Sequence, residues 1–369
     1  MTCSPFRVAL IGTGRVGYQF SFSDLPDNHA EAVAANSRTQ LVAGVNRGRE
    51  KLEAFGTRFR VDALYHDVGQ MLTGAKPDIC IIATHPELHA QMVVECAAAA
   101  TVKAIICEKP MALSLAECDT MMAACERHSV LLQVNHNRRW HAEWQLAHQL
   151  LQDGAIGQLN HIYCYMDGCK PHPSWRSGHE GPLLHDYTHY FDLMDLYGGD
   201  VDWMCGTALQ RRQPWAVEDY ASAMMSFSSG STGLICGSEL TVYTDHAFEL
   251  RGTTGVIRMA GEQVHLSQAR QDWHEPDSGF QWSSLQPVEV ERPTPVSTYV
   301  EALSELLDAI DGRGRMRSDG AIGRRSMEMV SAVYASQANG NVPVRFPLTD
   351  TDNGVETLRR LGQFDDRTE

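Results

Sequence analysis

The first third of the chain alternates short, almost continuously apolar runs with segments in which apolar residues recur at helical spacing. The apolar runs predict strands at 7–12, 41–45, 79–84, 104–107 and 131–134. The helical patterns lie between them, at 28–37, 49–58, 87–100 and 114–128. Ser114 followed by Glu117 is a capping-box start for the last of these helices. Apolar strands separated by helices predict a parallel sheet covered on both faces, with right-handed crossovers.

After about residue 150 the pattern changes to longer strands that alternate polar and apolar residues. These strands are expected at 159–168, 221–230, 231–240 and 246–261. Ser-Ser-Gly and Gly-Thr-Thr-Gly segments look like hairpin turns, so the sheet is expected to be antiparallel. Helical patterns occur near 184–197 and at 322–339. We therefore expect an α/β domain over 1–134 and an α+β domain over 135–369, with a ligand in the crevice between them.

Composition narrows the class of protein. A chain of 369 residues and 40.9 kDa is long enough for two domains. With 46 acidic and 31 basic residues, the formal net charge of −15 argues against a nucleic-acid partner and against binding to an anionic membrane surface. No apolar run reaches the roughly 20 residues of a membrane span, and the first strand leaves no room for a signal peptide. A cytoplasmic location is expected, with the ten cysteines as buried, reduced thiols, because no C-x-x-C pair occurs.

A glycine-rich motif follows the first predicted strand. It consists of Gly12, Thr13, Gly14, Arg15, Val16 and Gly17. In a G-x-G-x-x-G loop the first glycine permits a tight turn, the second lets a pyrophosphate approach the backbone, and the third lets helix pack on strand. The phosphates would lie at the N-terminus of the helix that the motif opens. The motif in this context predicts dinucleotide binding; the alternative is a plain tight turn.

The end of the second strand bears on which dinucleotide binds. An NAD site commonly has an acidic residue there, hydrogen-bonded to the ribose hydroxyls. Here the sequence has Asn46 and Arg47. Asparagine does not repel a 2′-phosphate, and arginine pairs with phosphate through two hydrogen bonds. The pattern favours NADP over NAD, although Arg47 could equally stack on the adenine of either cofactor.

Five segments, in this order and spacing, resemble the glucose–fructose oxidoreductase and inositol dehydrogenase (Gfo/Idh/MocA) family. They are RVALIGTGRVG, IIATHPELHA, IICEKPMALSLAE, VNHNRRW and GPLLHDYTHYFDLMDLYGG. The resemblance extends over nearly the whole chain and implies a Rossmann domain followed by an open, mainly antiparallel sheet domain. It implies oxidation or reduction of a carbinol or carbonyl of a sugar, polyol or sugar derivative with NAD(P). It also suggests a homo-oligomer, dimer or tetramer, formed through the outer sheet face.

The resemblance marks Lys109 as a catalytic residue beside the nicotinamide, where it would donate to the substrate oxygen or relay its proton. Glu108 would orient it, and the bond from Lys109 to Pro110 is implied to be cis. Outside this resemblance a lysine is usually a surface residue.

His189 corresponds to the family's general base, in a motif that reads Asp-x-x-x-His. Aligning His189 places His185, not an aspartate, at the carboxylate position, and Asp186 follows it. Either Asp186 takes the carboxylate role, since positions 186 and 189 share one helical face, or His185 serves as a neutral hydrogen-bond partner. The structural alternative for His189 is a core histidine.

Further contacts are expected from three segments. By resemblance, Thr84, His85, Pro86 and His89 lie along the cofactor; the alternative is an ordinary strand-to-helix turn. Expected substrate contacts are Lys109, Asn137, Arg138, Lys170, Trp175, Arg176, His185 and His189. A Trp-Arg loop suits sugar stacking and hydroxyl contacts, whereas Arg138 or Arg139 could instead form a domain-interface ion pair. The His pairs 85/89 and 185/189 have metal-ligand spacing, but without H-E-x-x-H or a cysteine cluster we expect no metal.

Three functions remain open from the sequence. The first is a sugar or polyol oxidoreductase with a small carbohydrate substrate. The second is a lyase or hydrolase that uses tightly held NAD to oxidise a glycoside transiently and eliminate its aglycone. The third is a non-catalytic cofactor sensor that binds a partner protein. Net turnover of the cofactor separates the first from the other two.

Overall fold

The computed structural model describes residues 4–21, 23–168, 180–211, 215–261, 263–274 and 281–365. Its contacts divide the chain into two units. The first contains residues up to His141 together with 296–327, and the second contains 142–295 together with residues from Glu328 onward. The chain therefore passes from one unit to the other three times, whereas the sequence pattern suggested a single boundary after residue 134.

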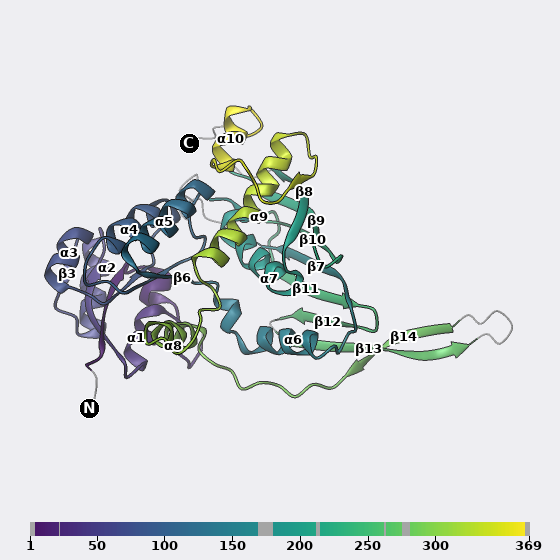
Figure 1. Cartoon of the computed structure of the whole chain (residues 1–369), viewed down its shortest axis with the longest axis horizontal. Coiled ribbons are helices and arrows are strands. Elements are labelled where there is room, and N and C mark those ends of the chain that lie inside the picture. The colour runs from purple at the N-terminus through teal and green to yellow at the C-terminus, as the bar shows by residue number, and fades with distance from the viewer. Residues whose placement is uncertain are drawn as a thin grey trace. The chain divides into compact units, whose positions relative to one another are not determined.

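The first unit contains a six-stranded parallel sheet in the order β3-β2-β1-β4-β5-β6 (Figure 1). Its strands are β1 (Phe6–Ile11), β2 (Thr39–Val45), β3 (Leu64–Tyr65), β4 (Ile79–Ile82), β5 (Ala104–Cys107) and β6 (Leu131–Val134). This order is that of a doubly wound Rossmann fold, in which ligands bind at the carboxyl ends of the strands. The five predicted strands are all present, and only the two-residue β3 was not predicted.

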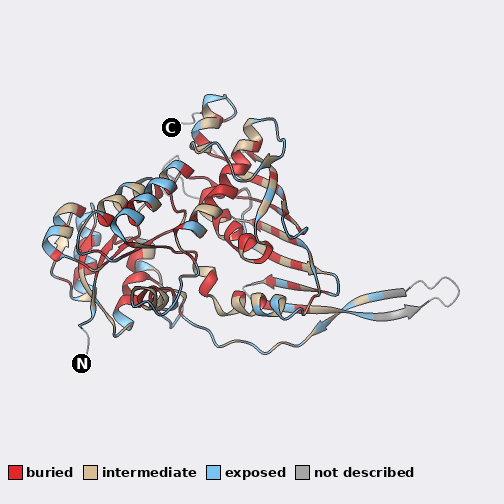
Figure 2. Cartoon of the chain, viewed as in Figure 1, coloured by how far each residue is buried: buried red, intermediate tan, exposed pale blue. Residues whose placement is uncertain are grey.

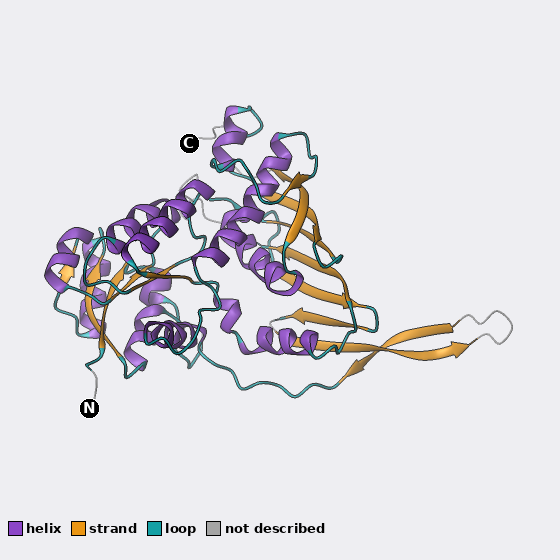
Figure 3. Cartoon of the chain, in the orientation of Figure 1, coloured by secondary structure: helices purple, strands orange, loops and turns teal. Residues whose placement is uncertain are grey.

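Helices cover both faces of this sheet (Figure 3). They are α1 (His29–Ala35), α2 (Arg49–Phe59), α3 (Val68–Ala75), α4 (His89–Ala97) and α5 (Leu115–His128). The predicted cap of α5 is present, because the Ser114 hydroxyl accepts the Glu117 N–H at 3.2 Å. The reciprocal bond is shifted by one residue, since the Glu117 carboxylate accepts the N–H of Leu113 at 2.9 Å.

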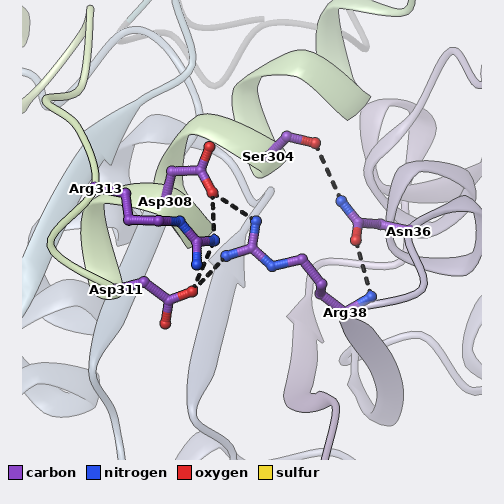
Figure 4. Close-up of polar contacts among 6 residues, drawn as sticks. All are labelled: Asn36, Arg38, Ser304, Asp308, Asp311 and Arg313. Carbon is purple, nitrogen blue, oxygen red and sulfur yellow. Dashed lines mark hydrogen bonds and ion pairs between the residues drawn. The ribbon is translucent and has the colours of Figure 1, made fainter. Parts of the chain in front are cut away.

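A helix from the C-terminal third of the chain completes the first unit. Three buried leucines of α8 (Thr298–Ile310), Leu303, Leu306 and Leu307, belong to the same apolar core as β1, β4 and α1. Polar contacts also join α8 and the residues that follow it to the α1–β2 connection (Figure 4). Arg38 lies 2.7 Å from Asp308 and 2.8 Å from Asp311. The helix is therefore an integral layer of the Rossmann unit.

The second unit contains a nine-stranded sheet in the order β14-β13-β12-β11-β7-β10-β9-β8-β15. Its strands are β7 (Leu159–Asp167), β8 (Val201–Leu209), β9 (Tyr220–Phe227), β10 (Thr232–Ser238), β11 (Asp245–Gly252), β12 (Gly255–Ala260), β13 (Gln263–His274), β14 (Gln281–Val288) and β15 (Val344–Arg345). Neighbouring strands are antiparallel except β7 and β10. The long strand predicted at 246–261 is in fact a hairpin, since Thr253 and Thr254 form a turn between β11 and β12.

One face of this sheet packs against helices, and the other, here called the open face, is covered by no helix of the described residues (Figure 2). The helices of the unit are α6 (Ala142–Gln152), α7 (Thr188–Gly198), the C-terminal part of α9 (Gly320–Ala338) and α10 (Gly354–Arg360). On the open face Met224 and Leu234 lie opposite each other on β9 and β10, and each side chain is 41% exposed. In the described part of the chain, we find no helix with the length and apolar character to cross a membrane.

The described cysteines carry free thiols, as the sequence predicted. Six of them are buried, and burial raises the pKa of several, including Cys107 and Cys118. Cys236 is an exception, because its side chain lies on the open face of the sheet and is exposed. The prediction that all strand cysteines are buried is wrong at this position.

Candidate active site

The glycine loop lies at the carboxyl end of β1. Its three glycines differ in whether the surrounding structure would accept a side chain. Gly12 has a φ of +98°, and a Cβ there would lie 2.4 Å from the carbonyl oxygen of Ala83. A Cβ on Gly17 would lie 2.2 Å from the Gly12 carbonyl oxygen. A Cβ on Gly14 would meet no described atom within 4 Å. Of the three glycines, only Gly14 could therefore carry a side chain without a clash in the described structure. The open space beside it fits the approach of a pyrophosphate.

The helix that the glycine motif was expected to open is much shorter than predicted. Residues Arg15–Gln19 form one π-helical turn, η1, and the regular helix α1 begins only at His29. Pro26 lies in the intervening segment, and the Asn28 side chain caps α1 by accepting the Glu31 N–H at 2.9 Å. The loop therefore offers backbone N–H groups of a single turn.

Within the loop, each side chain has a distinct environment. Thr13 is fully buried, and Val16 packs against the core of the unit. The guanidinium of Arg15 lies 4.0 Å from the centre of the Phe20 ring. Of these predicted cofactor residues, Arg15 alone presents an exposed side chain.

The end of β2 is tied to the glycine loop. The Asn46 amide donates to the Thr13 hydroxyl at 2.8 Å and accepts the Gly48 N–H at 2.8 Å. Arg47 is exposed and forms no ion pair with any described residue, whereas Arg49 pairs with Glu53 at 2.7 Å. The Arg47 guanidinium is therefore available to an anionic group at the strand end where the ribose of a dinucleotide lies in this fold.

The loop after β4 is held by a buried histidine. His89 is the first residue of α4, with 0% exposure, and its ring nitrogens lie 3.0 Å from the Pro110 carbonyl oxygen and 3.2 Å from that of Thr84. Because the ring has no exposed surface, any effect of His89 on a cofactor acts through these two loops. His85 is exposed and Pro86 begins the short helix η2 (Pro86–Leu88).

The loop after β5 contains a buried carboxylate. Glu108 is 5% exposed, and its Oε1 accepts from His29 Nε2 at 2.8 Å and from Asn135 Nδ2 at 2.7 Å. Burial alone would raise the pKa of this carboxyl, but the hydrogen bonds and charge of His29, the Asn135 bond and the charge of Lys109 together lower it. Glu108 is therefore held ionised inside the unit. The sequence pattern did not identify His29 or Asn135.

Lys109 follows directly, and its side chain is half-buried. The bond to Pro110 is cis, as the resemblance implied, and the Lys109 N–H donates to Glu108 Oε2 at 3.3 Å. Nearby, His136 is buried, and burial together with the charges of Arg139 and Lys109 lowers its pKa to about 3. His136 is therefore neutral at physiological pH.

The short helix η3 (Asn137–Trp140) follows β6. Arg139 is buried and donates to the Arg317 carbonyl oxygen at 3.1 Å, so it links two segments of the first unit. Arg138 is half-buried. The buried amide oxygens of Asn135 and Asn137 have no hydrogen-bond partner among the described residues. Unsatisfied acceptors of this kind are destabilising unless another donor reaches them.

The histidines predicted to exchange protons with the substrate, His185 and His189, lie in the second unit. Residues Leu183–Tyr187 form a π-helical turn, η5, that continues into α7, and His189 lies half-buried in the first turn of α7. His185 Nδ1 lies 2.8 Å from Asp186 Oδ1, with side-chain exposures of 30% and 22%. An ionised carboxylate only accepts, so the Asp186 contact places a proton on Nδ1, and in the neutral ring the lone pair is then on Nε2.

Three predicted substrate residues, Lys170, Trp175 and Arg176, lie outside the described residues. Among the described side chains, no group of three or more His, Cys, Asp or Glu residues is arranged to hold a metal ion.

Comparison with known proteins agrees with these features. Residues 6–136 match the oxidoreductase family with an NAD-binding Rossmann fold, and residues 144–258 match the GFO/IDH/MocA C-terminal domain. D-apiose dehydrogenase of Paraburkholderia graminis is 27% identical over 355 residues, which cover 92% of this chain and 89% of that protein. Myo-inositol 2-dehydrogenase of Thermotoga maritima is 26% identical over 258 residues, 68% of this chain and 74% of that protein.

The fold has close counterparts among solved structures. The WlbA dehydrogenase of Bordetella pertussis, solved with NADH and UDP-GlcNAcA, superposes with a TM-score of 0.77 at 22% identity, covering 93% of this chain and 99% of that one. Since the two family models match the two units in turn, and both sheets and the glycine loop agree with them, the chain belongs to the Gfo/Idh/MocA family of NAD(P)-dependent oxidoreductases.

Proposed function

We propose that this chain transfers a hydride between a nicotinamide cofactor and a carbinol or carbonyl carbon of a sugar, polyol or sugar derivative. The observation that carries the proposal is the glycine loop, where Gly14 leaves space that no described atom fills. Relatives named D-apiose dehydrogenase and myo-inositol 2-dehydrogenase support the substrate class.

The bound nicotinamide would supply or accept the hydride. Lys109, half-buried beside the Glu108 carboxylate, would donate a hydrogen bond to the substrate oxygen and stabilise charge on it. His189 would take the hydroxyl proton during oxidation. His185, whose tautomer Asp186 fixes, would be a second group able to exchange a proton through Nε2. In this proposal Asp186 takes the role of the family's aspartate, although it lies one position later in the sequence than the family motif places it.

For the cofactor we propose NADP. No carboxylate stands at the end of β2, and the exposed Arg47 is available for a 2′-phosphate. Arg47→Ala should then raise the KM for NADP about tenfold or more while leaving that for NAD nearly unchanged. Arg49→Ala is the matched control, since Arg49 is already paired with Glu53. An equal effect of Arg47→Ala on both cofactors would assign the arginine to adenine stacking.

The decisive experiment screens sugars, polyols and sugar acids with NAD and NADP separately, using wild type, Lys109→Met and His189→Ala. We expect stoichiometric reduction of the cofactor by wild type, and loss of at least about 10²-fold in kcat for each variant. Release of an aglycone without net cofactor reduction would instead indicate the transient-oxidation enzyme. Cofactor binding with no turnover on any substrate would indicate a sensor.

We also propose that the chain forms a homo-oligomer through the open sheet face of the second unit. Leu234 has Tyr163 as its neighbour on β7 and Met224 as its neighbour on β9, so an aromatic side chain and two exposed apolar side chains form one row across the sheet. Such residues are enriched in interface cores. Sedimentation of the Met224→Glu/Leu234→Glu double variant should show a smaller species than wild type.

A further inference from the structure

The buried cluster at Glu108 contains a histidine to which the proposed reaction gives no role. His29 is the first residue of α1 and is 3% exposed, with Nε2 2.8 Å from Glu108 Oε1. Its ring stands edge-on to that of Tyr299 in α8, with 4.9 Å between ring centres. The cap by Asn28 fixes where α1 begins. The ring is therefore fixed from two sides and aimed at the carboxylate.

Glu108 connects this histidine to Lys109. One carboxylate oxygen receives hydrogen bonds from His29 and Asn135, and the other receives the backbone N–H of Lys109 at 3.3 Å. A buried carboxylate is tolerated only when its oxygens have such donors. Because the Lys109 backbone N–H is hydrogen-bonded to this carboxylate, the position of the carboxylate affects the direction in which the Lys109 side chain projects.

We propose that His29 is a positioning residue for Lys109, acting through Glu108. It holds the carboxylate ionised and in the rotamer that accepts the Lys109 N–H. The inference rests on the proposed function, in which Lys109 acts on the substrate oxygen. His29 itself is 3% exposed, and we assign it no direct contact with substrate or cofactor.

Two substitutions separate the hydrogen bond from the volume of the ring. His29→Leu keeps an apolar side chain of similar size but removes the donor. His29→Gln places an amide N–H near the former Nε2 and keeps the donor. His128→Ala is the matched control, because His128 is an exposed histidine at the end of α5 in the same unit.

The position of Lys109 can be read without cofactor or substrate. The chain has only five lysines, so reductive methylation with ¹³C-formaldehyde gives a small set of dimethyl-lysine NMR signals, and Lys109→Arg assigns that of Lys109. We expect the Lys109 signal to move in His29→Leu and in Glu108→Gln, and to stay in place in His29→Gln and His128→Ala. An unmoved Lys109 signal in His29→Leu overturns the proposal. If His29→Leu does not fold, an unmoved signal in Glu108→Gln, which keeps the shape of the side chain, overturns it equally.

Turnover gives an independent reading. Misplacement of a catalytic group by about 1 Å lowers kcat about 10²-fold, so His29→Leu should lose about that much in kcat with a smaller change in KM. Its kcat should also gain a pH dependence from Glu108, whose carboxyl is no longer held ionised, and His29→Gln should restore most of the rate. A wild-type kcat in His29→Leu, or a His29→Gln as slow as His29→Leu, contradicts the proposal. Full turnover by Lys109→Met contradicts the proposed function instead, and the NMR result still decides where Lys109 lies.

Discussion

The two units hold their candidate catalytic groups in different ways. In the first, Glu108, which lies next to the candidate catalytic Lys109, is buried and bound by His29 and Asn135 from distant parts of the chain. In the second, His185 and Asp186 are sequence neighbours that pair with each other while partly exposed. The first arrangement fixes loops at a strand edge before any ligand arrives, which is the preorganisation that electrostatic catalysis requires. The second leaves its polar atoms within reach of a ligand.

The largest effect is expected where the exposed pair is broken. Asp186→Asn removes the charge that fixes the His185 tautomer, and we expect kcat to fall about 10²-fold to 10⁴-fold, as for other general acid–base groups. The measurement is the pH dependence of kcat and kcat/KM. Asp153→Asn, an exposed carboxylate at the end of α6, serves as control. A wild-type rate in Asp186→Asn would remove the pair from the proposed chemistry.

Acid stability tests the buried side of the comparison. The pKa of His136 lies at about 3 in the folded protein and 6.5 ordinarily, so between these values the unfolded chain binds more protons. The free energy of unfolding should therefore fall as pH falls through this range, by roughly 1.4 kcal/mol for each pH unit. His136→Gln should show a flatter profile in denaturant titrations between pH 7 and 4. Parallel profiles for variant and wild type would show that His136 is not held neutral.

The two glycines sharpen the distinction between groups fixed by the fold and groups left for a ligand. Gly12→Ala should destabilise the free protein by about 1–3 kcal/mol, because an alanine at positive φ is strained and its Cβ meets Ala83. Gly14→Ala should leave the melting temperature unchanged but weaken NADPH binding about tenfold or more, through its Cβ in the open space. Thermal unfolding and fluorescence titration measure both. Unweakened binding by Gly14→Ala would show that no phosphate lies there.

The smallest effect is expected from an exposed charge network. Arg38 pairs with Asp308 and Asp311, which also pair with Arg313, and all four side chains are at least one-third exposed. Arg38→Ala should therefore lower the free energy of unfolding by less than about 1 kcal/mol, and by less still at high salt. Urea titrations at two salt concentrations provide the measurement. A loss as large as that of Gly12→Ala would show that this network fixes α8 more strongly than an exposed pair can.

Much of the first unit could be predicted from sequence because its signals are local. A short apolar run such as 79–84 between two helical patterns indicates a strand without knowledge of its partners, and the Ser114 cap depends only on its own neighbours. The helix α8 was not predicted, and an amphipathic pattern would in any case not indicate which sheet the helix covers. The two residues of β3 are too few for any periodicity.

The candidate site shows the same limit. The glycine motif and Lys109 were found because short motifs carry them. His29 was missed, since its partner Glu108 lies 79 positions away. From the sequence, Asp186 was one of two candidates for the carboxylate role, because residues three apart lie on the same face of a helix and Asp186 would then lie near His189. In the π-helical turn Asp186 pairs with the adjacent His185, a contact that regular helical spacing does not predict.

The late arrival of α8 has a consequence for biosynthesis. Three leucines of this helix complete the core of the Rossmann unit, yet about 150 residues of other structure are translated before it. Domains usually fold as they leave the ribosome, N-terminal first. Here the nascent N-terminal unit keeps an apolar face uncovered until translation has passed residue 310. Residues 142–295 of the second unit are thus synthesised before the first unit can close, and a fragment ending at His141 should need a chaperone to stay in solution.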